Sequence, residues 1–172
     1  MERLWSPWRS AFIMSADESK GDGNSPFSRA FAEPERDAEN YLLHRGGQAF
    51  IIMNRYPYNA GHLLVVPVRE TGDFLDLSHE ESDEVMRLIR LGLAALRRAL
   101  DPQAFNVGMN LGRTAGAAID RHVHFHIVPR WNGDTNFMPV LDETRVISER
   151  MDDIYRKLRD ALREIREMGE MP

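Results

Sequence analysis

The chain has 172 residues, of which 42% are hydrophobic and 28% charged, a composition typical of one soluble globular domain. A formal net charge of −5 excludes a general nucleic-acid-binding surface. The absence of cysteine excludes disulfides, thiolate metal ligands and a cysteine nucleophile. No apolar run approaches the roughly 20 residues of a membrane span, and the charged, Pro7-interrupted N-terminus does not read as a signal peptide. We therefore expect a cytoplasmic protein with neither nucleic-acid nor membrane partners.

Residues 1–40 are expected to be an irregular N-terminal segment. They begin with Trp5, Trp8 and Phe12 and are broken by turn-forming runs around Pro26 and Pro34. We expect the aromatic side chains to pack on the body of the protein or on a partner, because exposure would forfeit their burial energy. Residues 41–172 are expected to form the folded domain.

Three strands and a helix are expected next. Apolar runs predict strands at 41–44, 49–54 and 62–68, with turn-forming residues between the second and third. Ser78, with Glu81 three residues later, is a capping-box signature for a helix that Asp101-Pro102 ends.

Two more strands, at 105–111 and 122–129, flank a glycine-bearing loop. An amphipathic helix is expected from about 148 to 168. The order of elements predicts an α+β fold with a mainly antiparallel sheet, one helix between strands and one at the C-terminus.

Three histidines, His122, His124 and His126, stand at alternate positions of the last predicted strand. Period two places their imidazoles on one face, within about 13 Å of one another, so one substrate can touch all three. One interpretation is a metal site, because imidazole is the commonest zinc ligand. A ligated ring normally also donates to an acceptor, and Asp120 beside the row is not evident as a ligand. A second is buried histidines satisfied by the backbone. The favoured reading is phosphate chemistry, in which a neutral imidazole attacks phosphorus beside a cationic neighbour.

The run from His122 to Val128 resembles the signature of the histidine triad (HIT) superfamily of nucleotidyl hydrolases and transferases. Segments 58–67 and 110–116 resemble the same family, and 129–139 is similar to its bacterial branch that includes diadenosine tetraphosphate phosphorylases. The resemblance covers roughly 41–168. It implies a HIT-like fold, a homodimer, and cleavage of dinucleoside polyphosphates through a covalent nucleotidyl-histidine intermediate, as a hydrolase or a phosphorylase.

The same resemblance implies roles for four histidines. His124 would be the nucleophile, and His126 would hydrogen-bond the α-phosphate. The backbone carbonyl of His122 would hold the ring of His124 in the attacking tautomer. His62 is expected to approach from the neighbouring strand and orient the triad, although a plain strand-start residue is the alternative.

Nucleotide contacts are implied at further positions, each with an ordinary structural alternative. Asn54 would contact the ribose or cap a turn, and Asn110 would contact the phosphates or end a strand. Trp131 would stack on the nucleotide or close the core. Candidates for the base pocket, with core packing as the alternative, are Phe27, Leu43 and Ile52.

Two positions depart from the family pattern. Ala117 and Ala118 stand where many members have Gly, Ser, Thr or Gln, and a lost hydroxyl donor removes roughly 1.5–3 kcal/mol at the transition state. Their backbone N–H groups are still expected to bind phosphate. The alternative function is therefore a nucleotide-binding HIT module with weak or no turnover.

The second departure lies at Ser25 and Ser28, where some relatives hold a structural zinc with Cys-x-x-Cys. We therefore expect no zinc and no tightly bound cofactor, and at most a divalent ion that accompanies the substrate phosphates.

Overall fold

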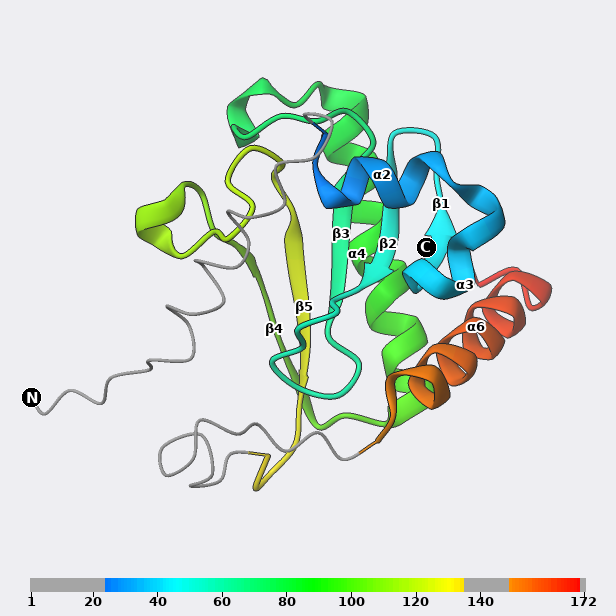
Figure 1. The fold of residues 1–172 in the computed structure, drawn as a ribbon. Helices are drawn as coiled ribbons and strands as arrows, with labels where there is room; N and C mark the ends of the chain where they lie inside the picture. The colour runs from blue at the N-terminus through cyan, green and yellow to red at the C-terminus, as the bar shows by residue number, and fades with distance from the viewer. Residues whose placement is uncertain (1–23, 135–148, 171–172) are drawn as a thin grey trace, which may run out of the picture.

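Five strands form one sheet in the order β1-β2-β3-β5-β4 (Figure 1). The computed structural model describes residues 24–134 and 149–170. Every neighbouring pair in the sheet is antiparallel, which confirms the α+β class and the mainly antiparallel sheet. The strands are β1 (Leu42–Arg45), β2 (Ala49–Met53), β3 (Leu63–Pro67), β4 (Ala104–Met109) and β5 (Phe125–Arg130).

The two long helices lie where they were predicted. Helix α4 (His79–Leu100) joins β3 to β4, and Ser78 and Glu81 form the expected capping box at its start. It ends at Asp101, which adopts the left-handed conformation with φ of 46° before Pro102. Helix α6 (Met151–Glu167) begins at the C-terminal edge of a segment, 135–148, that lies outside the described residues. No helix in the described ranges is long and apolar enough to cross a membrane.

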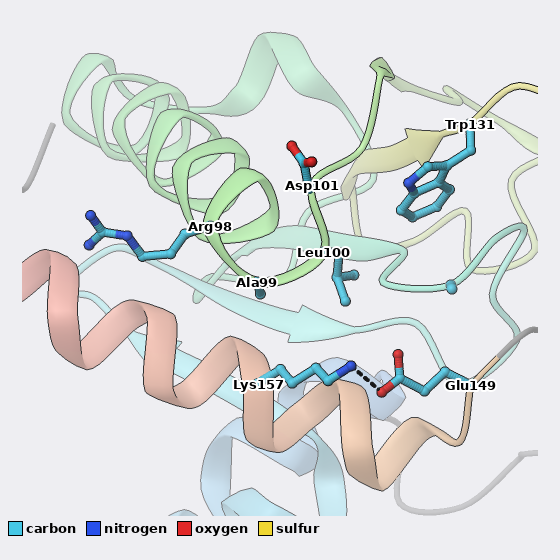
Figure 2. Close-up of a pocket in the computed structure, with 8 residues that line it drawn as sticks. Arg98, Ala99, Leu100, Asp101, Trp131, Glu149 and Lys157 are labelled. Atoms are coloured by element: carbon cyan, nitrogen blue, oxygen red, sulfur yellow. Dashed lines mark ion pairs between the residues drawn. The ribbon is translucent and has the colours of Figure 1, made fainter.

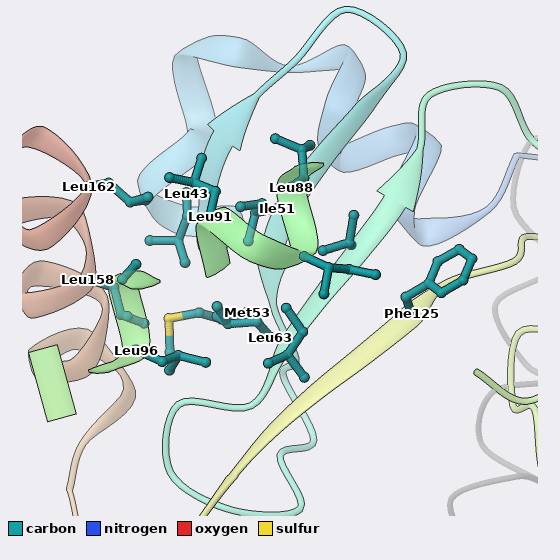
Figure 3. Close-up of a cluster of buried hydrophobic side chains, with 14 of the residues drawn as sticks. Leu43, Ile51, Met53, Leu63, Leu88, Leu91, Leu96, Phe125, Leu158 and Leu162 are labelled. Atoms are coloured by element: carbon teal, nitrogen blue, oxygen red, sulfur yellow. The ribbon is translucent and has the colours of Figure 1, made fainter. Parts of the chain in front are cut away.

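Helices α4 and α6 cover one face of the sheet. Their side chains and those of the strands form the larger of the two hydrophobic clusters in the described residues (Figure 3). Side chains of β2 and β3 meet leucines of both helices there. The cluster includes Ile51, Met53, Leu63, Leu88, Leu91, Leu96, Leu158 and Leu162. Because neighbouring residues of a strand point to opposite faces, the alternate residues of the same strands must be covered from the other side.

Helix α2 (Pro26–Ala32) covers part of that other face, and Figure 1 shows it on the opposite side of the strands from α4. Its Phe27 packs with Phe50, Ile52 and Leu64 in the second hydrophobic cluster. The continuous apolar sequence of β2 follows from this arrangement, since all five of its residues are buried between two layers.

The helical structure of residues 26–40 corrects the expectation of an irregular segment. Beyond α2, a short 3₁₀ turn (Pro34–Arg36) and α3 (Asp37–Asn40) follow. These helices are too short to show a helical period in the sequence, and tertiary contacts hold them: Arg45 of β1 donates to the carbonyl of Phe31 and pairs with Asp37. Trp5, Trp8 and Phe12 lie outside the described residues, and the domain boundary after residue 40 stays a prediction.

A second correction concerns the histidine row. Strand β5 begins at Phe125, so His122 and His124 precede the strand instead of belonging to it. The reason is a change of partner: the N–H of Val123 donates to the carbonyl of Thr71 at 2.7 Å, in the loop after β3. The row is therefore held partly by the sheet and partly by this loop.

Candidate active site

Two adjacent central strands bring four histidines together. His126 lies on β5 opposite Leu64 of β3, and His62 immediately precedes β3. Nε2 of His62 is 2.9 Å from Nδ1 of His126, and the rings of His124 and His126 have centroids 5.0 Å apart. The structure thus brings His62 to the triad, as expected from the sequence.

The tautomer of His124 follows from a single contact. Its Nδ1 lies 2.8 Å from the main-chain oxygen of His122, and a carbonyl accepts only, so Nδ1 carries the proton. The lone pair is therefore on Nε2. Burial lowers the pKa of His124 below its ordinary value of 6.5, against a smaller opposing effect of that hydrogen bond, so the ring is neutral at neutral pH. A neutral imidazole with a fixed lone pair is a nucleophile.

The tautomers of His62 and His126 are set in sequence. The backbone N–H of Tyr58 donates to Nδ1 of His62 at 3.0 Å, so the proton of a neutral His62 is on Nε2. Nε2–H then donates to Nδ1 of His126. The proton of His126 is consequently on its own Nε2, where it can donate to a phosphoryl oxygen.

His122 is fully buried and held at both ring nitrogens. Its Nε2 lies 2.8 Å from the carbonyl oxygen of Pro67, and its Nδ1 lies 2.6 Å from the hydroxyl of Ser25. Burial lowers the pKa of His122 below 6.5, despite the raising effects of the Pro67 hydrogen bond and of Glu70. The side chain of His122 therefore faces protein on both sides, and its main-chain oxygen is the group that contacts His124.

Two aromatic side chains flank the row. The ring of Phe27 lies 5.1 Å from that of His124 and 5.7 Å from that of His122. The half-exposed ring of Tyr58 is stacked on His126 at 5.8 Å and lies 4.7 Å from His62. Phe27 belongs to the second core cluster, which is the core-packing alternative, and its place in a base pocket stays a prediction.

The two predicted asparagines lie beside the histidines. Nδ2 of Asn54 is 3.3 Å from Nδ1 of His62, while its Oδ1 accepts the N–H of Tyr56, which is the turn-capping alternative. Asn110 directly follows β4, in which Met109 pairs with Phe125. His124 directly precedes Phe125, so Asn110 and His124 both adjoin this last pair of the ladder.

The loop before the triad corrects one expectation. The N–H of Ala117 donates to the carbonyl of Gly112 at 3.3 Å, and the Ala117 side chain is buried, so this N–H is already used inside the loop. The positive φ angles of Gly112 and Gly116, 77° and 94°, make this compact turn possible. Ala118 is half-buried and stays a candidate contact.

Two other candidates lie away from the histidines. Leu43 belongs to the cluster under α4 and α6, on the opposite face of the sheet from Phe27 and Ile52, so the three do not form one base pocket. Trp131, just after β5, packs against that same larger cluster, which is the core-closing alternative. Its role in nucleotide binding stays a prediction.

Trp131 also lines a pocket of about 500 Å³ near the C-terminal end of α4 (Figure 2). Across it, Lys157 of α6 pairs with Glu149 at 2.6 Å. Arg98 and Leu100 of α4 complete one wall. None of the lining residues is a histidine, so this pocket is separate from the row.

Sequence reasoning missed Tyr58, Glu70 and the part that Ser25 plays. Tyr58 lies inside a segment that resembles the family, four residues before His62, and its proximity to a turn was the available signal. Ser25 is 97 positions from His122 in the chain, and nothing in their spacing indicates the contact. Within the described ranges, no group of three or more His, Asp or Glu side chains is arranged to hold a metal ion.

The HIT domain family model matches residues 35–133. The chain belongs to the HIT family. A relative from Mycobacterium tuberculosis named AP-4-A phosphorylase is 38% identical over 162 residues, covering 92% of this chain and 83% of the relative.

Two further comparisons concern part of the chain and the fold. The bis(5'-nucleosyl)-tetraphosphatase of Schizosaccharomyces pombe is 32% identical over 93 residues, covering 54% of this HIT chain and 50% of the relative. The crystal structure of a zinc-bound histidine triad family protein from Mycobacterium smegmatis superposes with a TM-score of 0.69 at 24% identity, covering 86% of this chain and 99% of that one. The fold is thus the α+β HIT fold that the sequence predicted.

Proposed function

We propose that the protein cleaves dinucleoside polyphosphates of the diadenosine tetraphosphate type through a covalent nucleotidyl-histidine intermediate. The observation that carries this proposal is the fixed tautomer of His124: its Nδ1–H is bonded to the main-chain oxygen of His122, so Nε2 presents a lone pair. The relative named AP-4-A phosphorylase supports the substrate class, because it matches 92% of this chain.

The reaction follows from the arrangement of the rings. Nε2 of His124 attacks the α-phosphorus, a nitrogen–phosphorus bond forms, and the bond from phosphorus to the bridging oxygen breaks. The leaving group takes the remaining phosphates and the second nucleoside. Nε2–H of His126 donates to a phosphoryl oxygen and offsets its charge as it develops. Water or inorganic phosphate then breaks the nitrogen–phosphorus bond and releases His124.

The ring nitrogens supply what the chemistry needs without a held metal ion. A divalent ion would arrive with the phosphates of the substrate, because Mg²⁺ keeps most of its water and is commonly bound by phosphate oxygens. It would not require a protein cage.

A nucleotide-binding module with weak or no turnover is the second candidate. The loop before the triad favours it, since the side chains of Ala117 and Ala118 have no hydroxyl and the N–H of Ala117 is bonded to Gly112. Fewer donors would then reach the leaving phosphates.

The deciding experiment is incubation with diadenosine tetraphosphate, with and without inorganic phosphate, followed by identification of the products by mass. AMP with ATP indicates that water resolves the intermediate, and ADP with ATP indicates phosphate. His124→Ala should abolish either reaction. Binding of AMP by the wild type without any turnover would instead support the binding module.

We propose a homodimer in which β4 lies at the interface. Of the two edge strands of the described sheet, β1 and β4, it is β4 whose residues are mostly exposed, with Val107 47% exposed. An exposed edge strand with apolar side chains is a template for pairing. Light scattering should report a dimer that Val107→Lys dissociates and that Leu75→Lys, at an exposed site in a different element, leaves intact.

We also propose a cytoplasmic location, supported by the absence of cysteine and by the nucleotide substrate class. Fractionation of cells that express the tagged chain at native level tests it.

A further inference from the structure

A chain of hydrogen bonds reaches the first histidine of the row from outside the catalytic face. The hydroxyl of Ser28 donates to Oε2 of Glu70 at 2.7 Å, and the N–H of Ser25 donates to the same oxygen at 2.9 Å. The hydroxyl oxygens of the two serines are 3.0 Å apart, and that of Ser25 is 2.6 Å from Nδ1 of His122. We call Ser25, Ser28 and Glu70 the serine–glutamate cluster.

The direction of the donors is fixed because both ends of the chain are pure acceptors. Burial by itself would raise the pKa of Glu70, but the hydrogen bonds from Ser25 and Ser28 and the charge of Arg121 at 3.0 Å together lower it, so the carboxylate is ionised. At the far end, the carbonyl oxygen of Pro67 accepts the hydrogen bond from Nε2–H of His122.

One assignment of protons fits these ends. The hydroxyl of Ser28 donates its hydrogen bond to Glu70. The hydroxyl of Ser25 therefore donates to its shortest remaining contact, Nδ1 of His122. The oxygen of Ser25 in turn accepts the N–H of Ser28. His122 is thus held in one tautomer and one ring orientation.

The ring of His122 determines the peptide group that touches the nucleophile. The carbonyl of the peptide group between His122 and Val123 accepts a hydrogen bond from Nδ1–H of His124. The N–H of the same peptide group donates to the carbonyl of Thr71. Ser25 and His122 are both fully buried, so water cannot replace a hydroxyl lost from this position. A change at Ser25 is therefore transmitted to the ring of His124 through one residue.

We propose that Ser25 and Glu70 are positioning residues of the reaction, which fix His122 and thereby hold the ring of His124 with Nε2 facing the substrate. This inference rests on the proposed function only in taking His124 as the nucleophile. Neither residue touches the substrate. Helix α2 is docked by the same contacts, which also sets Phe27 against the ring of His124.

The test compares Ser25→Ala and Glu70→Gln with two controls of the same residue types away from the histidine row, Ser82→Ala and Glu167→Gln. Ser82 is a half-buried residue of α4 and Glu167 an exposed residue of α6. Nitrogen-15 NMR of the imidazoles reports the tautomers directly. In the wild type we expect His124 to be protonated on Nδ1 and His122 on Nε2. In Ser25→Ala we expect a mixture of tautomers at both rings, and in Glu70→Gln a smaller shift in the same direction.

Kinetics form the second part of the test. For Ser25→Ala, kcat should fall about tenfold, the factor that corresponds to one hydrogen bond of ordinary strength, while KM changes little because no substrate contact is lost. Thermal melts of all variants are measured alongside. Glu70→Gln keeps the test informative if Ser25→Ala does not fold, since the Glu70 side chain is partly exposed.

Wild-type tautomers in both variants would overturn the proposal, as would a fall in kcat of equal size in the controls. The NMR result needs no turnover. If the wild type shows the expected tautomers and the variants lose them, the positioning role stands even when diadenosine tetraphosphate is not cleaved, so the two failures are distinguishable.

Discussion

Nε2 of His62 and Nδ1 of His126 lie 2.9 Å apart although 64 positions separate the residues in the chain. The pairing of β3 with β5 creates this contact, because Leu63 pairs with Ile127 and Leu64 with His126. The backbone N–H of Tyr58 polarises the pair from the other side of His62.

Replacing His62 should therefore act through His126. His62→Ala removes the donor to Nδ1 of His126, so its proton is no longer confined to Nε2, and kcat should fall about tenfold. His62→Gln can place an amide N–H near the same point and should keep more of the rate. Steady-state kinetics with the three proteins decides it, and equal rates for Ala and wild type would refute the orienting role.

Tyr58 should contribute through the stacking of its ring. The ring is stacked on His126, whereas the contact to His62 Nδ1 comes from the main chain. Tyr58→Phe keeps the ring, so comparison with Tyr58→Ala isolates the contribution of the stacking. Tyr58→Ala should lose about 0.5–1.5 kcal/mol of unfolding free energy, the usual worth of an aromatic pair. Denaturant titrations of both variants measure the difference.

The acid limb of activity should lie below the range of an ordinary histidine. Attack requires neutral His124, and burial lowers its pKa from 6.5. The midpoint of the acid limb of kcat/KM should therefore lie below pH 6.5. A pH–rate profile with a limb centred above 6.5 would contradict the burial of this ring.

Stability should fall with acid in two stages. The folded protein disfavours charged His122 and His124, so their contribution is complete above 6.5 and is lost as the pH falls through their lowered pKa values. The hydrogen bond from Arg69 lowers the pKa of Glu81 below 4.5, and its contribution is lost only at still lower pH. Melting temperatures across pH 3–8 measure both stages. Each unit by which a histidine pKa is lowered on folding corresponds to about 1.4 kcal/mol of unfolding free energy.

Gly72 should be intolerant of any side chain. A Cβ there would lie 2.6 Å from the carbonyl oxygen of Asp120 and 3.2 Å from the Cα of Arg121, both main-chain atoms that cannot move without shifting His122. Gly72→Ala should lower both stability and kcat, the former by about 1–3 kcal/mol. Gly47→Ala is the matched control, because its Cβ would meet its nearest atom at 3.8 Å. Similar melting curves for the two variants would refute this packing argument.

The two alanines of the preceding loop should respond differently to serine. Ala117 is 3% exposed, so Ala117→Ser buries a hydroxyl and should reduce stability by about 1–3 kcal/mol. Ala118 is half-buried, and Ala118→Ser should add a donor near the phosphates and raise kcat by up to about tenfold. Melts and kinetics on both variants separate the effects; a slower Ala118→Ser would show that the added hydroxyl does not help the leaving group.

Local patterns predicted the elements that local physics determines. The capping box at Ser78 and the stop at Asp101 place α4 correctly, and the apolar runs place all five strands near their observed bounds. The alternating residues predict that β5 begins at His122, whereas it begins at Phe125. The N–H of Val123 donates to a loop carbonyl, and this contact cannot be inferred from an alternation of residue types.

Long-range contacts explain what the sequence could not indicate at the site. The resemblance to the HIT family identified the histidines and their neighbours, because their roles depend on a motif. The contacts of Ser25 with Glu70 and His122 join three distant segments, and each residue alone looks like an ordinary surface polar group. Only the docking of α2 on the sheet brings them together.

Main-chain groups form hydrogen bonds with three of the four histidines. The amide of Tyr58 bonds His62, the carbonyl of His122 bonds His124, and the carbonyl of Pro67 bonds His122. A peptide group is the same whatever side chain it carries, so most substitutions at position 58 leave this proton arrangement in place. Side chains around the histidine row can therefore be replaced during evolution, which changes nucleotide preference, while Nε2 of His124 keeps its lone pair.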